Sequence, residues 1–197
     1  MNQYRELLIG CGYSREKRIH PYKDPSRAYV SPYWRDLTTL DNNPECRPDV
    51  LCDLCDFNSH TYDTITGIYR RSFVNAFPEG NTFDEIHAYE VLEHAGAAGD
   101  YKLLFAQFTE FWRMLKPRGY FCATVPHWKS IWAWGDPGHM RVISAATLVF
   151  LDQDEYKIQI GKTAMSDYRA LLGETNFKRV SQRQVGELFE FVLRAEK

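Results

Sequence analysis

Short apolar stretches that end in Gly, Asp or Pro recur along the chain, and they predict the strands of a sheet. The seven expected strands are Arg5–Ile9, Leu37–Leu40, Val50–Leu54, Ile86–Val91, Tyr120–Val125, Phe177–Arg183 and Leu188–Ala195. A turn near Gly186 separates the last two, which favours an antiparallel hairpin at the end of the sequence.

Helical periodicity is strongest between the fourth and fifth expected strands, where it predicts a helix over Asp100–Leu115. Spacings of four, three and four positions place four apolar residues on one face, namely Leu104, Phe108, Phe111 and Leu115. Asp100 can cap the start of this helix, and Pro117 ends it. Weaker patterns predict further helices at residues 61–76, Ala145–Leu151 and Ser166–Gly173.

The alternation of strands and helices indicates an α/β fold. We expect a Rossmann-like three-layer sandwich, with a mostly parallel seven-stranded sheet that ends in an antiparallel C-terminal hairpin. A length of 197 residues fits one domain over residues 1–197. In such sheets ligands bind beyond the carboxyl ends of the strands, so the residues just after each strand are the first candidates for chemistry.

Composition narrows the class of protein. Hydrophobic residues make up 44% of the sequence and charged residues 25%, which is typical of a soluble globular protein. A formal net charge of −2 argues against binding nucleic acid through global attraction. We expect no membrane association, because no apolar run approaches the roughly 18–20 residues of a bilayer span. Five cysteines without a spaced framework favour free thiols, and we expect a cytoplasmic location.

Candidate chemistry follows the first four strands. Gly10-Cys11-Gly12 comes after the first, and glycines there let the backbone approach a ligand closely. Asp41 follows the second strand and can accept both hydroxyls of a ribose. Asp53-Leu54, at the third, can accept from an exocyclic amine and pack against a ring. Glu90 lies at the end of the fourth.

A dinucleotide-binding fingerprint requires a third glycine, and that position is Arg15 in this sequence. The missing glycine normally allows tight packing of the helix whose N-terminus holds a pyrophosphate, and no clear helix follows here. A nucleoside without phosphate needs no such cradle.

These segments resemble a known family. The series LLIGCG, TTLD, PDVLCDL, FDEIHAYEVLEH and FWRMLKPRGYFCATVPHW resembles class I S-adenosylmethionine-dependent methyltransferases. More narrowly, it is similar to the small methyltransferases of bacteria and phages that carry an LNLGCG-type motif. The stretch VPHWKSIWAWGDPGHMRVIS matches their VPHW…DPTHxRxF pattern. The resemblance covers roughly residues 5–151.

The resemblance implies S-adenosylmethionine as cofactor and assigns roles to particular positions. Gly10, Cys11 and Gly12 would contact its methionine portion, Asp41 its ribose, and Asp53 and Leu54 its adenine, while Glu90 would border the methionine end and the substrate. Two features depart from the family pattern. Leu8 stands where most members have an acid, and 29 residues separate Gly12 from Asp41 rather than about 20, which leaves Asp36 as an alternative ribose acid.

For methyl transfer the main task of the protein is alignment, and a general base is needed only if the acceptor must lose a proton. The candidate catalytic residues are Glu90, His127, Asp136 and His139, with His94 as a further one. The loop after the fifth strand favours His127 and the Asp136/His139 pair. Arg141 could bind an anionic group. Glu93-His94 has the alternative role of ending a strand.

The methyl acceptor is not identified by the sequence. Trp128, Trp132 and Trp134 could stack on an aromatic substrate such as a base, or simply cover an apolar face. The basic loop Arg15–Arg27 could bind an anionic substrate or a nucleic-acid backbone. Two other functions stay open, a non-catalytic binding module of the same fold and an NAD-binding oxidoreductase.

No metal site is predicted. Cys46, Cys52, Cys55 and His60 could be taken for zinc ligands. Cys52 and Cys55 should lie on opposite faces of a strand, however, whereas structural zinc requires four convergent ligands. Buried thiols are the better interpretation.

Overall fold

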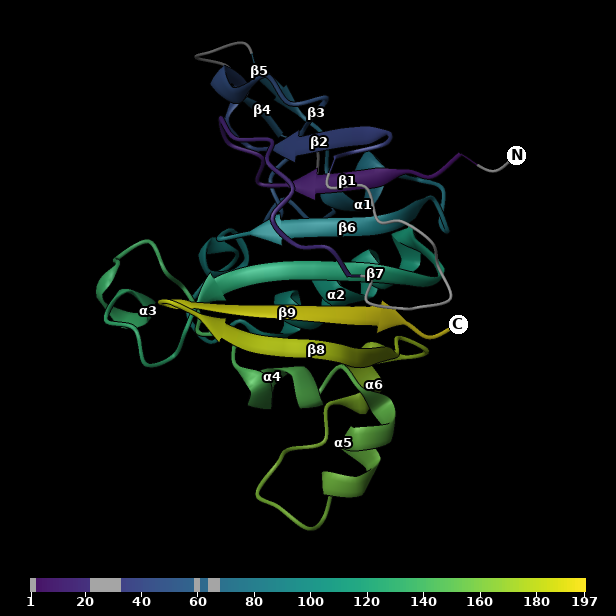
Figure 1. Cartoon of the computed structure of the whole chain (residues 1–197), viewed down its shortest axis with the longest axis vertical. Helices are drawn as coiled ribbons and strands as arrows, with labels where there is room; N and C mark the ends of the chain where they lie inside the picture. The colour runs from purple at the N-terminus through teal and green to yellow at the C-terminus, as the bar shows by residue number, and fades with distance from the viewer. Residues whose placement is uncertain (1–2, 22–32, 59–60, 64–67) are drawn as a thin grey trace.

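The computed structural model describes residues 3–21, 33–58, 61–63 and 68–197 of the chain. Its main sheet has the strand order β3-β2-β1-β6-β7-β9-β8 (Figure 1). The strands are β1 (Glu6–Ile9), β2 (Leu37–Asp41), β3 (Val50–Leu51), β6 (Phe83–Tyr89), β7 (Leu115–Pro126), β8 (Phe177–Val185) and β9 (Leu188–Ala195). The first five are parallel, and β9 runs antiparallel to both β7 and β8. The predicted seven-stranded, mostly parallel sheet with a C-terminal hairpin is confirmed.

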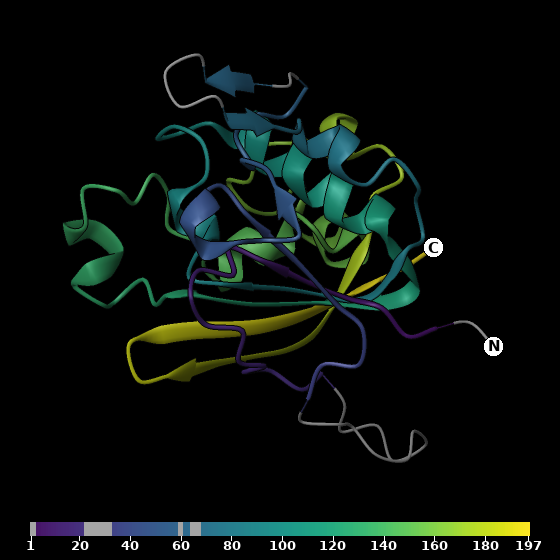
Figure 2. The same cartoon turned by 90° about the horizontal axis from the view of Figure 1, so that it is seen from above.

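Helices gather on one side of this sheet, as Figure 2 shows. They are α1 (Phe73–Ala76), α2 (Tyr101–Met114), α4 (Ala145–Val149), α5 (Gln153–Gln159) and α6 (Arg169–Leu172). Asp100 caps α2 by accepting a hydrogen bond from the Leu103 N–H. Phe108 and Phe111 of α2 are fully buried against Phe121 of β7, with ring centroids 5.4 and 4.7 Å from it. Each buried ring stabilises the fold by about 1.5–3 kcal/mol. None of the described helices combines the length and the apolar character that crossing a membrane demands.

The opposite face of the sheet has a different cover. Residues 13–21 run across it without helix, and Figure 2 shows this purple segment on the side away from α2. Ile19 belongs to the same apolar cluster as Leu8 of β1 and Cys122 of β7. Next to that cluster, Lys17 forms buried ion pairs with Glu6 and Glu85, at 2.5 and 2.6 Å. This face therefore combines apolar packing with buried charge.

One sequence prediction for the connecting segments is wrong, and one helix was not predicted. The helix expected over residues 61–76 is replaced by a small hairpin, β4 (Thr61–Asp63) and β5 (Ile68–Arg70), and only the last turn, α1, is helical. β-branched and aromatic residues in this stretch favour strands. The helix α5 was not expected, although Asp152 caps it by accepting from the Glu155 N–H.

The third strand is shorter than predicted and ends at Leu51. Directly after it the chain turns, because the Asp53 side chain accepts from the Cys55 N–H and its carbonyl accepts from the Asp56 N–H. This turn places Asp53 and Leu54 just beyond the carboxyl end of β3, where both residues line a cavity.

Candidate functional site

A cavity of about 360 Å³ opens at the carboxyl ends of β1, β2, β3 and β6, where the strand order reverses direction. Such a crevice is the expected ligand site of an open α/β sheet. Five of the predicted cofactor residues line it, namely Gly10, Asp41, Asp53, Leu54 and Glu90. Cys11 and Gly12 are not in the lining.

The glycine loop after β1 has a left-handed backbone that residues with side chains rarely adopt. Gly10 has φ +63°, and a Cβ there would lie 2.6 Å from Cγ2 of Val91. Gly12, at φ +50°, donates its N–H to Oδ2 of Asp41 at 2.8 Å. Cys11 is buried on the opposite face, and burial, with the nearby charge of Asp41, raises its pKa to about 11. Gly12 and Cys11 thus shape the loop, while Gly10 forms the wall.

Asp41 ties this loop to the next one. Its Oδ2 accepts from Gly12 and its Oδ1 accepts from the Asn43 N–H, both at 2.8 Å. A carboxylate oxygen can accept more than one hydrogen bond, so both oxygens can still bind hydroxyls. Asp36, the alternative ribose acid, precedes β2 and lies near Arg5, so it is at the far end of that strand.

Asp53 and Leu54 complete the far wall. Oδ1 of Asp53 accepts from the Cys55 N–H at 2.8 Å, and its Oδ2 accepts from the Asn42 side chain at 3.3 Å. Leu54 is buried and presents an apolar surface. Asp41 and Asp53 thus line the same cavity, and Gly12 lies next to it through its hydrogen bond to Asp41.

A second cavity, of about 400 Å³, lies beside the first. Its lining includes Trp132, Asp136, His139 and Glu187, together with Glu90 and His94, which also line the first cavity. The two cavities therefore meet at Glu90 and His94. The loop after β7 forms much of the second one, through α3 (Trp132–Gly135) and the residues that follow it.

Glu90 has an unusual backbone conformation for a residue with a side chain, with φ +55°. Its N–H donates to the Thr124 carbonyl, and its carboxylate lies 2.6 Å from the Arg18 guanidinium. Strained positions of this kind are concentrated at functional sites. Glu90 directly follows β6, and its side chain belongs to the wall that both cavities share.

Glu93 was missed as a candidate, and the structure places it at the second cavity. Its side chain is almost fully buried, with 2% of the residue exposed. Burial, together with the negative charges of Glu90 and Asp136, raises its pKa to about 7. Asp136 is half-exposed, and its Oδ2 lies 3.7 Å from Nε2 of His139. A carboxylate whose pKa is raised by burial in a cleft, as that of Glu93 is, is typical of functional sites.

His127 and Arg141 do not reach the second cavity. The His127 ring accepts from the Lys129 N–H at 3.2 Å, and its backbone N–H donates to the Glu187 carbonyl, so it shapes the loop after β7. Arg141 donates to the Asp100 carbonyl at 3.2 Å and thereby holds the start of α2. His127 and Arg141 thus contact the surrounding backbone, whereas Asp136 and His139 line the second cavity.

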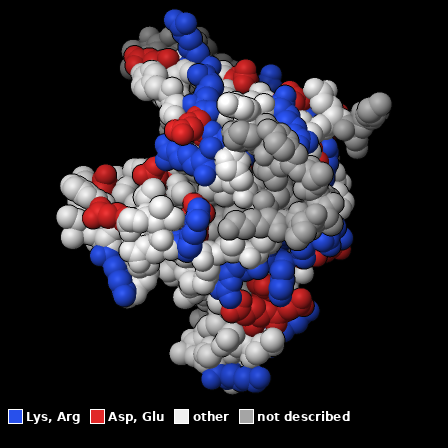
Figure 3. Space-filling model, in the orientation of Figure 1, with Lys and Arg blue, Asp and Glu red and all other residues white. Residues whose placement is uncertain are grey.

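In the described part of the basic loop, most basic side chains bind other residues of the chain. Arg15 donates to the carbonyls of Cys46 and Arg47, Lys17 is buried, and Arg18 pairs with Glu90. Lys23 and Arg27 lie outside the described residues. Figure 3 shows Lys and Arg side chains next to Asp and Glu side chains over one face of the molecule. These contacts weaken the interpretation of residues 15–18 as a nucleic-acid contact.

The cysteines considered for zinc are spread over the sheet. Cys46 and Cys52 belong to apolar clusters on opposite faces. The Cys55 sulfur accepts a hydrogen bond from the Gly96 N–H at 3.1 Å. Burial, with the charges of Asp53 and Asp56, raises the pKa of Cys52 to about 12. His60 lies outside the described residues.

Solved structures of methyltransferases resemble this chain in fold. The N-methyltransferase NodS of Bradyrhizobium japonicum WM9, in complex with S-adenosyl-L-homocysteine, superposes with a TM-score of 0.53 at 16% identity, over 99% of this chain and 79% of that one. The proposed methyltransferase bound to the Haloferax volcanii Trm112 activator gives 0.54 at 12% identity, over 100% and 84%. A proposed sarcosine dimethylglycine methyltransferase of Galdieria sulphuraria gives 0.50 at 13%, over 99% and 79%.

The chain has the class I methyltransferase fold. Neither a protein-family model nor a curated protein sequence matches it. The narrower likeness to the LNLGCG-type methyltransferases of bacteria and phages therefore stays a prediction. At these identities the methyltransferase fold locates the site, and the chemistry must be argued from the residues in it.

Proposed function

We propose that the protein binds S-adenosylmethionine in the first cavity and transfers its methyl group to an acceptor in the second. The observation that carries this proposal is the junction of the two cavities at Glu90 and His94. A bound cofactor and an acceptor would meet at that wall. Transfer needs close, in-line alignment of the two reacting atoms, which adjoining cavities can provide.

The residues present fit the cofactor. The missing side chain at Gly10 leaves room where a Cβ would collide with Val91, and both oxygens of Asp41 have capacity for ribose hydroxyls. Asp53 and Leu54 supply an acceptor and an apolar surface for adenine. S-adenosylmethionine supplies a methyl group on a sulfonium that leaves as a neutral thioether. Glu90 would face the positively charged methionine end.

The acceptor we propose is aromatic or neutral rather than rich in phosphate. Glu90, Asp136 and Glu187 line the second cavity, and their negative charges disfavour an anionic acceptor. Trp132 lines the same cavity and is 56% exposed, so it offers a face for stacking. The sequence left an anionic or an aromatic acceptor open, and the lining of the second cavity supports our proposal of an aromatic one.

Isothermal titration with S-adenosylmethionine and S-adenosylhomocysteine tests the proposal. We expect binding in the micromolar range by the wild type. Asp41→Ala removes the ribose acceptor and should weaken binding about 10- to 100-fold. Asp36→Asn is the matched control, because Asp36 lies at the other end of β2 and should leave the affinity unchanged.

The outcomes separate the competing functions. No binding by folded wild type would contradict the proposal, and NADH binding in a fluorescence titration would favour an oxidoreductase. Cofactor binding without turnover on fractionated extract, including DNA, tRNA and small metabolites, would favour a non-catalytic module. Leu8, which replaces the usual acid with an apolar side chain buried on the opposite face, is the feature that motivates this alternative.

A further inference from the structure

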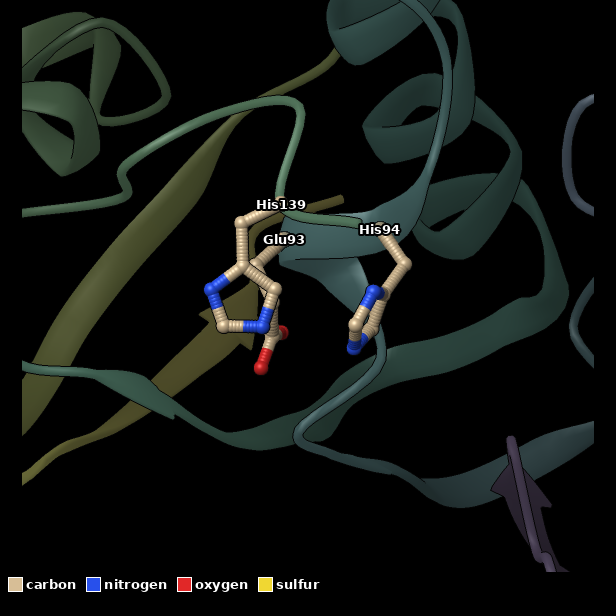
Figure 4. A group of neighbouring side chains, drawn as sticks. All are labelled: Glu93, His94 and His139. Atoms are coloured by element: carbon tan, nitrogen blue, oxygen red, sulfur yellow. The ribbon is translucent and has the colours of Figure 1, made fainter. Parts of the chain in front are cut away.

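Three side chains of metal-ligand type converge at the wall of the second cavity. Glu93, His94 and His139 each offer one ligand atom, and the three atoms lie within 4.8 Å of one another. Figure 4 shows the three side chains pointing the same way from two neighbouring segments. These segments are η2 (Leu92–His94) and the chain that follows α3.

The backbone holds the two segments in register. The Met140 N–H donates to the Glu93 carbonyl at 2.7 Å, and the Arg141 N–H donates to the same oxygen at 3.3 Å. The His139 N–H donates to the Asp136 carbonyl at 3.1 Å, which closes the turn before it. The cluster is thus positioned by main-chain contacts.

Both imidazoles are oriented by the nitrogen that faces away from the cluster. Nδ1 of His94 lies 3.1 Å from the Gly138 carbonyl, and Nδ1 of His139 lies 2.8 Å from the Trp132 carbonyl. A carbonyl oxygen can only accept, so each Nδ1 carries the hydrogen and each neutral ring has its lone pair on Nε2. Metal-binding histidines are held in this way by a second hydrogen bond to a carbonyl or carboxylate.

The Glu93 carboxylate has no cationic partner among the described residues. Its Oε2 is buried without a hydrogen bond, and the described ion pairs include none to Glu93. The neighbouring charges of Glu90 and Asp136 are negative. A buried, unpartnered carboxylate is unfavourable, and a cation at this point would relieve it.

We propose that the Glu93 carboxylate and the Nε2 atoms of His94 and His139 bind a divalent transition-metal cation, such as Zn²⁺, Co²⁺ or Mn²⁺. Two imidazoles and a carboxylate suit these ions better than Mg²⁺, which prefers oxygen ligands alone. Three protein ligands leave coordination positions open, and the ligands lie at the wall next to the first cavity. The cation site goes beyond the proposed methyl transfer and does not depend on it.

The test uses the whole chain, stripped with a chelator and titrated with Co²⁺ while the visible absorption of the ion is recorded. We expect one Co²⁺ per chain, with d–d bands that signal nitrogen and oxygen coordination. Glu93→Gln and His139→Gln should each weaken binding about 100-fold or more and remove the bands. His127→Gln is the matched control, because His127 lies in the same loop outside the cavity and should bind Co²⁺ as the wild type does.

Three outcomes would overturn the site. They are no stoichiometric Co²⁺ or Zn²⁺ binding by the wild type, unchanged binding in both variants, or tighter binding of Mg²⁺ than of Co²⁺. Glu93→Gln removes a buried charge, so this variant should fold even if His139→Gln does not. Titration of the stripped protein with S-adenosylmethionine gives a separate isotherm, and failure of one site is thereby distinguished from failure of the other.

Discussion

Two clusters of the same chemical groups lie in different parts of the molecule. Glu6, Glu85 and His87 form one under residues 13–21, and Glu93, His94 and His139 form the other at the second cavity. The first encloses the ammonium of Lys17, which binds both carboxylates. In the second, no Lys or Arg of the described residues forms an ion pair with Glu93.

Because of this difference, the pKa of buried Glu85 is lowered whereas the pKa of buried Glu93 is raised. Burial opposes ionisation of Glu85, but the hydrogen bond from His87 and the charge of Lys17 outweigh it and hold the pKa at about 2. Burial without such partners raises the pKa of Glu93 to about 7. A buried carboxylate thus indicates a binding site only where the fold leaves it without a cation.

The hydrogen bonds of the first cluster form a closed chain. The Tyr89 hydroxyl accepts from the Ile19 N–H at 3.1 Å and donates to Nδ1 of His87 at 2.6 Å, so His87 donates from Nε2 to Glu85 at 2.7 Å. Burial lowers the pKa of His87 and favours this neutral form. Every polar group in this chain has a partner, which is the signature of a structural network.

The largest expected effect comes from removing the internal cation. Lys17→Met leaves Glu6 and Glu85 buried next to each other without a cation, and it should lower the free energy of unfolding by about 3–5 kcal/mol. Urea unfolding followed by circular dichroism measures this. The double variant Lys17→Met/Glu6→Gln removes one of the two charges and should recover part of the loss. A loss below about 1 kcal/mol in Lys17→Met would remove the contrast between the clusters.

The first cavity could be predicted from the sequence to a greater extent than the cluster around Lys17. Gly10, Asp41 and Asp53 were expected at the cavity because strand ends are local features, and parallel strands bring such ends to one edge. The partners of Lys17 could not be predicted, since Glu85 is distant in sequence and a charge in a loop usually faces solvent. Alternating Glu85, His87 and Tyr89 in a strand was the available signal of a polar face.

The second cluster was only partly predicted for the same reason. His94 and His139 were recognised separately as candidates, whereas Glu93 was taken for the end of a strand. Their convergence depends on contacts such as the one between His94 and Gly138, 44 positions apart. The Glu-His pair directly after a strand was the local signal, and its meaning required the tertiary structure.

A smaller effect is the pH dependence of stability, to which Glu93 and Glu85 contribute in opposite directions. The raised pKa of Glu93 means that the folded state binds this proton more tightly than the unfolded state. Its contribution to stability is therefore complete below about pH 4 and is lost as the pH rises through about 7, by about 3 kcal/mol. The lowered pKa of Glu85 acts in the opposite direction, and its contribution is lost as the pH falls from about 4 towards 2.

Unfolding free energies measured from pH 4 to 8 with chelator present check this expectation. Glu93→Gln cannot ionise, so its profile should be flatter than that of the wild type over the neutral range. Parallel profiles for the two proteins would show that Glu93 is charged and compensated in the folded state. They would then remove the reason to expect a cation beside it.

The smallest effect on the free energy of unfolding is expected at Arg18, directly next to Lys17. Arg18 pairs with Glu90 at 2.6 Å, but the two side chains are 39% and 43% exposed, and the guanidinium also lies over the Tyr89 ring at 5.3 Å. Exposed pairs contribute about 1 kcal/mol or less, and salt screens them. Arg18→Met should therefore cost at most about 1 kcal/mol in urea unfolding, with a smaller cost in 1 M salt. A loss as large as that of Lys17→Met would mean that residues 13–21 cover the sheet as one unit, and that burial of an individual charge does not decide its contribution.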